Sequence, residues 1–292
     1  MATKQLCFAI AAALAVSACG QEQGEAEKAR GELEKTAGVL DSGAEWTAAV
    51  PPEWNGVLLL WSHGYDPTLS PAEYAPPSVA DALLSQGYAL AGSAYSSGGW
   101  ALEDAVPDQA ATIDAFSELY SAPETVIGWG MSMGGLVTTA LAEDAGSGLD
   151  GGLSMCSSMG GAVGMMNMAL DGAYAFKTLV VPQSDIRLVD VDDDFANLRR
   201  VQAALAEARE TKAGRARVAL AAVLAGLPGW TDAKSPKPAA DDVWAQEEQM
   251  ARALPMGVFL PRTDQEKRAG GRFSWNDGID YAAQLDKSGR RD

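Results

Sequence analysis

The residues best suited to chemistry lie at positions 130–135, where the sequence Gly-Met-Ser-Met-Gly-Gly places Ser132 among small neighbours. The apolar run from Thr125 to Trp129 precedes this serine and has the pattern of a buried strand, and a helical pattern follows it. A serine hydroxyl is a poor nucleophile until a base takes its proton. The sequence contains one histidine, His63, far upstream. The pattern therefore predicts a serine nucleophile at a strand-to-helix turn and leaves its base open.

His63 belongs to a second segment of interest, His63-Gly64-Tyr65, which directly follows the apolar run 57–62. A continuous apolar run bounded by turn residues is typical of a strand covered on both faces of a parallel sheet. Strand and helix patterns then alternate along the chain, which predicts βαβ units with helices on both faces of the sheet. The expected strands cover residues 57–62, 88–92, 125–129 and 152–156, and the expected helices cover 78–86, 102–120 and 133–145.

The combined pattern of strand, Gly-x-Ser-x-Gly, helix and upstream His-Gly resembles the α/β-hydrolase superfamily over residues 46–158. The resemblance implies that Ser132 is the nucleophile and that the backbone N–H groups of Met133 and Tyr65 form the oxyanion hole. It implies a structural role for His63 and Gly64, which shape the oxyanion loop. Gly130 and Gly134 would form the tight nucleophile elbow. The implied reaction is hydrolysis of a small-molecule carboxylic ester through an acyl-serine intermediate, with amides as the neighbouring substrate class, and without a cofactor.

One departure from the superfamily pattern bears on activity. The catalytic groups there follow the order Ser, Asp or Glu, His, and no histidine follows position 63 in this sequence. Our interpretation is that the chain stops before the last strands of the sheet, so that the sheet is incomplete and the chain as given is inactive. Neither Asp185 nor Asp264 is singled out as the acid. The alternative is a non-catalytic envelope lipoprotein that uses a hydrolase scaffold to bind a ligand or partner.

Beyond residue 158 the sequence becomes mainly helical, with helical spacing at 195–209, 214–227 and 241–254. We therefore expect residues 159–292 to form a helical cap or insertion on an α/β core. Five methionines follow the nucleophile helix, and they could form a core under this cap or an adaptable wall facing Ser132. They are Met155, Met159, Met165, Met166 and Met168.

The N-terminus has the features of an export signal. Lys4 precedes the apolar run 6–16, and Val-Ser-Ala-Cys at 16–19 resembles a bacterial lipobox. The resemblance implies a signal peptide at 1–18, acylation of Cys19 and anchoring in the bacterial cell envelope by lipid. Residues 19–45 are polar and predict a flexible acidic linker.

The formal net charge of −17 disfavours binding to nucleic acid. The glycines near Ser132 lack the spacing of a dinucleotide loop. The acidic run 190–194 begins like a calcium loop, but Phe195 stands where that loop needs glycine, so a turn that caps the next helix is favoured. No metal site is predicted. We expect Cys156, which lies in an apolar run, to be a buried small side chain.

Overall fold

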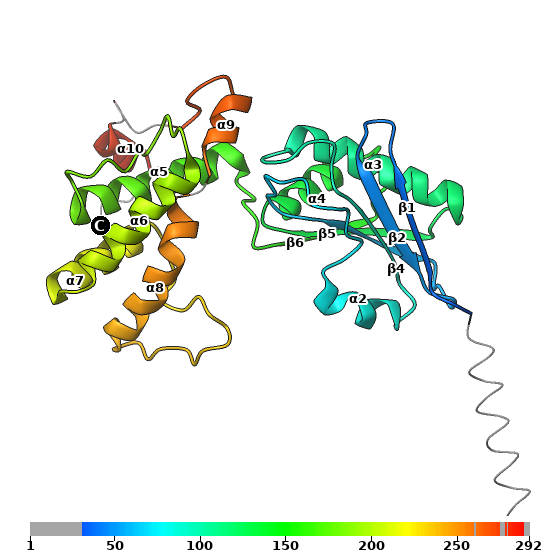
Figure 1. Cartoon of the computed structure of the whole chain (residues 1–292), viewed down its shortest axis with the longest axis horizontal. Coiled ribbons are helices and arrows are strands. Elements are labelled where there is room, and N and C mark those ends of the chain that lie inside the picture. Colours follow the sequence, from blue (N-terminus) through cyan, green and yellow to red (C-terminus); the bar gives the residue numbers. More distant parts are fainter. Residues whose placement is uncertain (1–30, 260, 275–277, 279, 289–292) are drawn as a thin grey trace, which may run out of the picture. The chain divides into compact units, whose positions relative to one another are not determined.

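The computed structural model describes residues 31–259, 261–274, 278 and 280–288, and the chain divides into two compact units at Ser157 and Ser158 (Figure 1). Each unit has its own hydrophobic core, and the two are described separately. The predicted signal peptide, Cys19 and residues 20–30 of the predicted linker lie outside the described residues. No helix within the described ranges is long and apolar enough to cross a bilayer.

The first unit is built on a six-stranded sheet in the order β1-β2-β4-β3-β5-β6. β4, β3, β5 and β6 are parallel to one another, whereas β1 and β2 form an antiparallel hairpin at one edge, and β2 pairs antiparallel with β4. The predicted α/β class is confirmed. The strands are β1 (Glu34–Val39), β2 (Glu45–Val50), β3 (Val57–Ser62), β4 (Ala89–Ser93), β5 (Thr125–Met131) and β6 (Gly151–Met155).

Helices cover both faces of this sheet, α2 (Pro77–Leu84) on one and α3 (Leu102–Leu119) and α4 (Met133–Glu143) on the other (Figure 1). Because side chains alternate along a strand, β3 contributes to both layers. Leu58 and Leu60 are fully buried in the core under α3 and α4, and Leu59 packs on the α2 side. This explains the continuous apolar run, since β3 supplies apolar side chains to the layers on both faces of the sheet.

Two sequence predictions in this unit need correction. Residues 34–39, which we assigned to the linker, form β1 and pair with β2 from Glu34↔Val50 to Val39↔Glu45. The strand was missed because its sequence, EKTAGV, is that of a mostly exposed edge strand with few apolar residues. Cys156 is exposed and has a φ of 48°, so it is not the buried side chain we expected.

The second unit is helical in all its described elements. Its core lies between α5, α6, α7 and α8, and it includes Phe176, Val201, Val218 and Leu254. Residues 178–180 form the end of α5, and residues 256–258 form the end of α8. The helices are α5 (Gly161–Val180), α6 (Asp194–Ala208), α7 (Lys212–Leu224), α8 (Val243–Val258), α9 (Thr263–Arg268) and α10 (Tyr281–Ser288).

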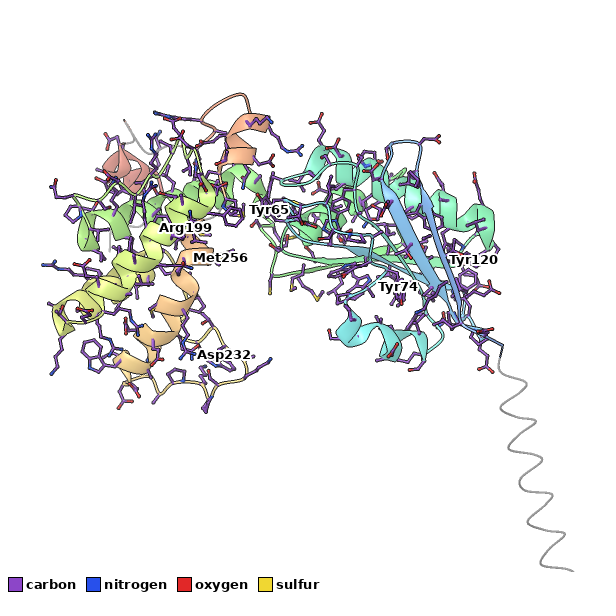
Figure 2. The ribbon with its side chains drawn as sticks, viewed as in Figure 1. Tyr65, Tyr74, Tyr120, Arg199, Asp232 and Met256 are labelled. Carbon is purple, nitrogen blue, oxygen red and sulfur yellow. The ribbon has the colours of Figure 1, made fainter. Side chains whose placement is uncertain are left out.

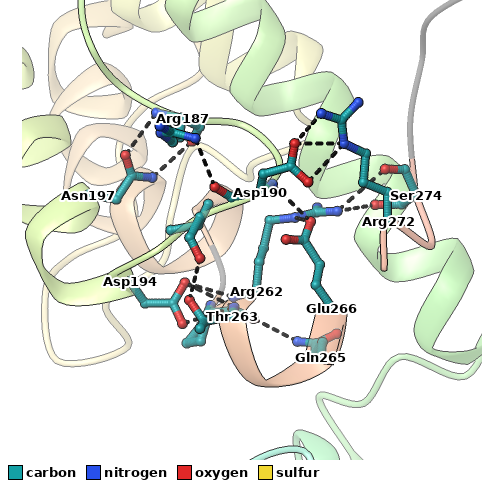
Figure 3. A network of polar contacts seen from close by, with 12 residues as sticks. Arg187, Asp190, Asp194, Asn197, Arg262, Thr263, Gln265, Glu266, Arg272 and Ser274 are labelled. Carbon is teal, nitrogen blue, oxygen red and sulfur yellow. Dashed lines mark hydrogen bonds and ion pairs between the residues drawn. The ribbon is translucent and has the colours of Figure 1, made fainter. Parts of the chain in front are cut away.

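A polar network joins the loop before α6 to the segment around α9 (Figure 3). Asp194 accepts from the backbone N–H of Arg262 at 2.8 Å, and Arg262 contacts Glu266 at 3.1 Å, both side chains being buried. Arg272 binds Asp190, and this pairing holds the pKa of that carboxyl below its usual range. Asp193 accepts from the Ala196 N–H at 2.8 Å and so caps α6. The acidic run thus serves helix capping and loop closure.

Glu247 is the one fully buried carboxylate among the described side chains of the helical unit, and two arginines hold it. Arg209 Nε lies 2.7 Å from Oε1, and Arg215 Nε lies 2.7 Å from Oε2. Removing the carboxylate leaves both guanidinium groups without their anionic partner, and Arg215 keeps its hydrogen bond to the Trp244 carbonyl oxygen. We expect Glu247→Ala to lower the free energy of unfolding by about 3 kcal/mol.

The neighbouring substitution Glu248→Ala is the matched control, because its i,i+4 pair with Arg252 is solvent exposed. Such pairs contribute at most about 1 kcal/mol. The unfolding midpoints of the two variants in urea are compared, with hydrogen exchange of the α6, α7 and α8 amides as the probe of unfolding. Equal midpoints for Glu247→Ala and Glu248→Ala would show that the buried pair does not stabilise this unit.

Candidate active site

Ser132 lies at the junction of β5 and α4, where the chain reverses direction at the end of the parallel strands. Its backbone has φ 57° and ψ −124°, a region that non-glycine residues rarely adopt. Its N–H donates to the Met155 carbonyl oxygen at 3.0 Å, which ties the turn to the end of β6. The side chain is exposed. Ser132 therefore stands at the sheet edge in a strained turn, with its hydroxyl open to an approaching molecule.

The glycines beside Ser132 allow this turn because α4 passes very close to the end of β3. A Cβ atom on Gly134 would overlap the Ser62 carbonyl oxygen and would lie 2.5 Å from that of His63. A Cβ on Gly130 would overlap the backbone of Gly134. Any side chain at these positions would push the helix away from the strand. The close backbone contacts thus explain why glycine is required at positions 130 and 134, independently of any motif.

Met133 is the first residue of α4, and its side chain is fully buried in the core of the sheet unit. The first N–H groups of a helix have no intrahelical acceptor, and the helix dipole favours negative charge there. The N–H groups of Gly135 and Leu136 point back to the Ser132 carbonyl oxygen, at 3.2 and 3.4 Å. The Met133 N–H is accordingly placed at a helix end that suits an oxyanion. Its role as a donor stays a prediction.

The His63-Gly64-Tyr65 segment runs beside the elbow, because β3 and β5 are neighbours with Ser62 opposite Gly130. A Cβ on Gly64 would lie 3.7 Å from the Ser132 Cβ atom, so the two loops are nearly in contact. Tyr65 is half-buried against the sheet core and lies at the end of the sheet away from Tyr120 (Figure 2). The structure thus brings together all seven residues predicted at the elbow and oxyanion loop.

His63 is held by its surroundings. Its Nδ1 lies 2.8 Å from the Gly64 carbonyl oxygen, and its ring stacks on Tyr95 with centroids 3.9 Å apart. Tyr95 also donates from its hydroxyl to the His63 carbonyl oxygen at 3.0 Å. Burial raises the pKa of the Tyr95 hydroxyl, so it remains a donor. These contacts fit a residue that shapes a loop, which is the role we predicted for His63.

Two supporting residues on α3 escaped the sequence analysis. Gln109 is fully buried and donates from Nε2 to the Trp61 carbonyl oxygen at 2.6 Å and to Ser62 Oγ at 2.8 Å. Asp108 is buried too, and it accepts from the backbone N–H of Ser96 at 2.7 Å. They fix the ends of β3 and β4. The available signal was two adjacent polar residues within an otherwise apolar helix face, which does not identify their partners.

The other predicted groups lie elsewhere or are not placed. The candidate acids Asp185 and Asp264 both belong to the helical unit, and Asp264 pairs with Arg268 at 3.1 Å. Met166 is fully buried within that unit, whereas Met159 and Met168 are exposed. The described residues contain no group of three or more His, Cys, Asp or Glu side chains arranged to hold a metal ion.

The first unit thus has a mostly parallel sheet with helices on both faces and a serine in a strained turn between β5 and α4, which is the architecture that the resemblance to the α/β-hydrolase superfamily implied. No protein-family model matches the chain. Its sequence is 29% identical over 273 residues to the o-phthalyl amidase of Xanthobacter agilis. The match covers 84% of this chain and 59% of the amidase, so the chain spans about three fifths of that relative's length.

Solved structures with some likeness include an esterase of Pyrococcus furiosus, with 17% identity and a TM-score of 0.38 over 51% of this chain and 56% of the esterase. An acylaminoacyl peptidase of Pyrococcus horikoshii has 17% identity and a TM-score of 0.37, over 61% of this chain and 31% of the peptidase. Likenesses this weak give no information on the reaction or substrate.

Proposed function

We propose that this protein is a serine hydrolase that cleaves carboxylic esters or amides through an acyl-serine intermediate at Ser132. The observation that carries the proposal is the strained, exposed Ser132 between β5 and the N-terminus of α4. A nucleophile held in this way is raised above the sheet edge, and the helix end beside it favours developing negative charge. Sequence similarity to an amidase supports the same class of reaction.

The proposed mechanism uses the residues of the elbow and of the oxyanion loop. Ser132 Oγ attacks the carbonyl carbon of the substrate, and the carbonyl oxygen becomes an oxyanion that accepts from the N–H groups of Met133 and Tyr65. The bond from the carbonyl carbon to the leaving oxygen or nitrogen then breaks, the alcohol or amine leaves with the proton that the general base took from Ser132, and an acyl-serine remains. Water attacks this ester and releases the acid. A general base must take the Ser132 proton, and we assign none of the described residues to this role, since His63 is engaged in its loop.

Hydrolysis of a neutral 4-nitrophenyl ester and of the matching 4-nitroanilide by the protein from its complete reading frame tests the proposal. We expect hydrolysis of at least one of the two, with a burst of nitrophenol in the first turnover if deacylation is the slower step. The alternative, a non-catalytic lipoprotein that binds a ligand or partner, predicts no turnover above that of Ser132→Ala. Turnover that survives Ser132→Ala would also contradict the proposal.

We also propose that the protein is exported and anchored in the cell envelope through a lipid on Cys19. The support is the sequence alone, a short apolar run that ends in Val-Ser-Ala-Cys. Metabolic labelling with an alkynyl fatty acid should mark the wild-type protein, and Cys19→Ser should abolish the label and release the protein from membranes. Cys7→Ser is the matched control and should keep the label. Equal labelling of both variants would overturn this assignment.

A further inference from the structure

The two units of the chain differ sharply in charge. Residues 31–157 contain 17 Asp and Glu but only one Lys or Arg, Lys35, which gives this unit a net charge of −16 with histidine neutral. Residues 158–292 contain 19 acidic and 18 basic residues, a net charge of −1. The negative charge of the protein is therefore concentrated on the unit that carries Ser132.

The single lysine of that unit lies away from the Ser132 edge. The strand pairing locates Lys35 along the sheet. Lys35 lies opposite Ala49, and the register continues through Leu90 to Leu59 on β3. Leu59 stands four positions before His63. At the rise of a strand this is roughly 13 Å along the sheet from the oxyanion loop. Its ammonium lies 5.8 Å from the centre of the Tyr74 ring, and Tyr74 lies well apart from Tyr65 (Figure 2). Lys35 therefore does not offset the carboxylates beside Ser132.

A pocket of about 230 Å³ opens beside the elbow. It is lined by His63, Gly64, Tyr65, Asp66, Ser70, Pro71 and Glu73. Gly64 connects it to the candidate nucleophile, since a Cβ there would lie 3.7 Å from the Ser132 Cβ atom. A substrate whose carbonyl carbon reaches Ser132 thus has this pocket next to it. The volume suits a small substituent, such as a short acyl chain or the alcohol part of an ester.

Two carboxylates, Asp66 and Glu73, set the charge of this pocket. Asp66 accepts from the N–H and hydroxyl of Thr68 at 2.8 and 2.6 Å, and from the N–H of Ser70 at 2.7 Å. These hydrogen bonds, the Thr68 hydroxyl first, hold the pKa of Asp66 well below its usual range, so it stays ionised. The Glu73 side chain is exposed at the pocket. His63 is the only basic residue among those that line the pocket.

We infer that the pocket beside Ser132 favours esters or amides whose substituent there is cationic or neutral over those that place a carboxylate in it. Clefts lined by one sign of charge concentrate substrates of the opposite sign by about 10- to 1000-fold, an effect that salt screens. The inference rests on the proposed function. It extends that function by specifying the charge of the preferred substrate, which depends on the charge of the pocket and not on the geometry of the elbow.

Three 4-nitrophenyl esters of equal chain length, with acyl chains ending in a tert-butyl, a trimethylammonium or a carboxylate group, test the inference. We expect kcat/KM at low ionic strength to be at least about tenfold higher for the cationic than for the anionic ester. The ratio should fall toward one in 0.5 M NaCl, because the interaction is screened. Taking the ratio cancels any general change in catalytic rate.

Glu73→Gln, which removes one pocket carboxylate, should lower the cation-to-anion ratio about threefold. Glu124→Gln is the matched control, because it removes the same charge next to Gly56 at the opposite end of β3, and it should leave the ratio unchanged. An anionic ester hydrolysed as fast as the cationic one, or equal effects of the two variants, would overturn the inference alone. Failure to hydrolyse the neutral ester would contradict the proposed function itself, and the inference would fall with it.

Discussion

Replacing Ser132 by alanine should lower kcat/KM for ester hydrolysis by about 10⁴- to 10⁶-fold, because removing the nucleophile of a serine hydrolase has an effect of this size. Residual hydrolysis would come from the oxyanion donors and from binding. The substitution removes one exposed oxygen atom, so the fold should persist. Alanine keeps a Cβ at the positive φ, and the strained turn is therefore retained.

Initial rates with the neutral nitrophenyl ester, measured beside urea unfolding, give the result. Ser78→Ala, another exposed serine at the start of α2, is the control and should leave both quantities unchanged. A Ser132→Ala enzyme that keeps more than about a tenth of its activity would require a different nucleophile. A large loss of stability in Ser132→Ala would mean that its activity loss reports unfolding and not chemistry.

Gly134→Ala should disrupt the sheet unit itself. The added Cβ would overlap the Ser62 carbonyl oxygen and crowd that of His63, so α4 must move away from the end of β3. Overpacking against rigid backbone costs about 3 kcal/mol or more, and the displaced helix would also carry Ser132 and Met133 away from the oxyanion loop. We therefore expect a lower urea midpoint together with loss of esterase activity.

Gly164→Ala provides the contrast, because this α5 glycine has nothing within 4 Å of an added Cβ and has no positive φ. Alanine is favoured over glycine in a helix by about 1 kcal/mol, so this variant should be slightly more stable. A Gly134→Ala protein with wild-type stability and activity would show that α4 does not lie against β3 as described.

The sequence predicts the centre of the sheet and the elbow because those features are local. The run 57–62 is apolar at nearly every position, and Ser132 stands between glycines that follow one strand and open a helix. The β1–β2 hairpin was not predicted. Its outer strand carries Glu34 and Lys35 at an exposed edge, and its inner strand buries small alanines. Such strands gain their stability from pairing, which periodicity does not reveal.

The supporting shell of the site could not be predicted for a related reason. Gln109 reaches residues 47 and 48 positions away, and Tyr95 stacks on a histidine 32 positions upstream. Single residues of these types have many uses in a fold, and only the strand order brings them together. The exposure of Cys156 could not be predicted either. Strand β6 ends at Met155, so Cys156 lies just beyond the strand although it belongs to the same apolar run.

Mapping a covalent fluorophosphonate adduct tests the central claim most directly. Digestion after glutamate releases residues 125–143, a peptide in which Ser132 is the only serine. For the protein from its complete reading frame, we predict that this peptide gains the phosphonate mass and that the modification is absent from Ser132→Ala. An active esterase whose label falls on any other peptide, with 125–143 unmodified, would contradict the assignment of Ser132 as the nucleophile.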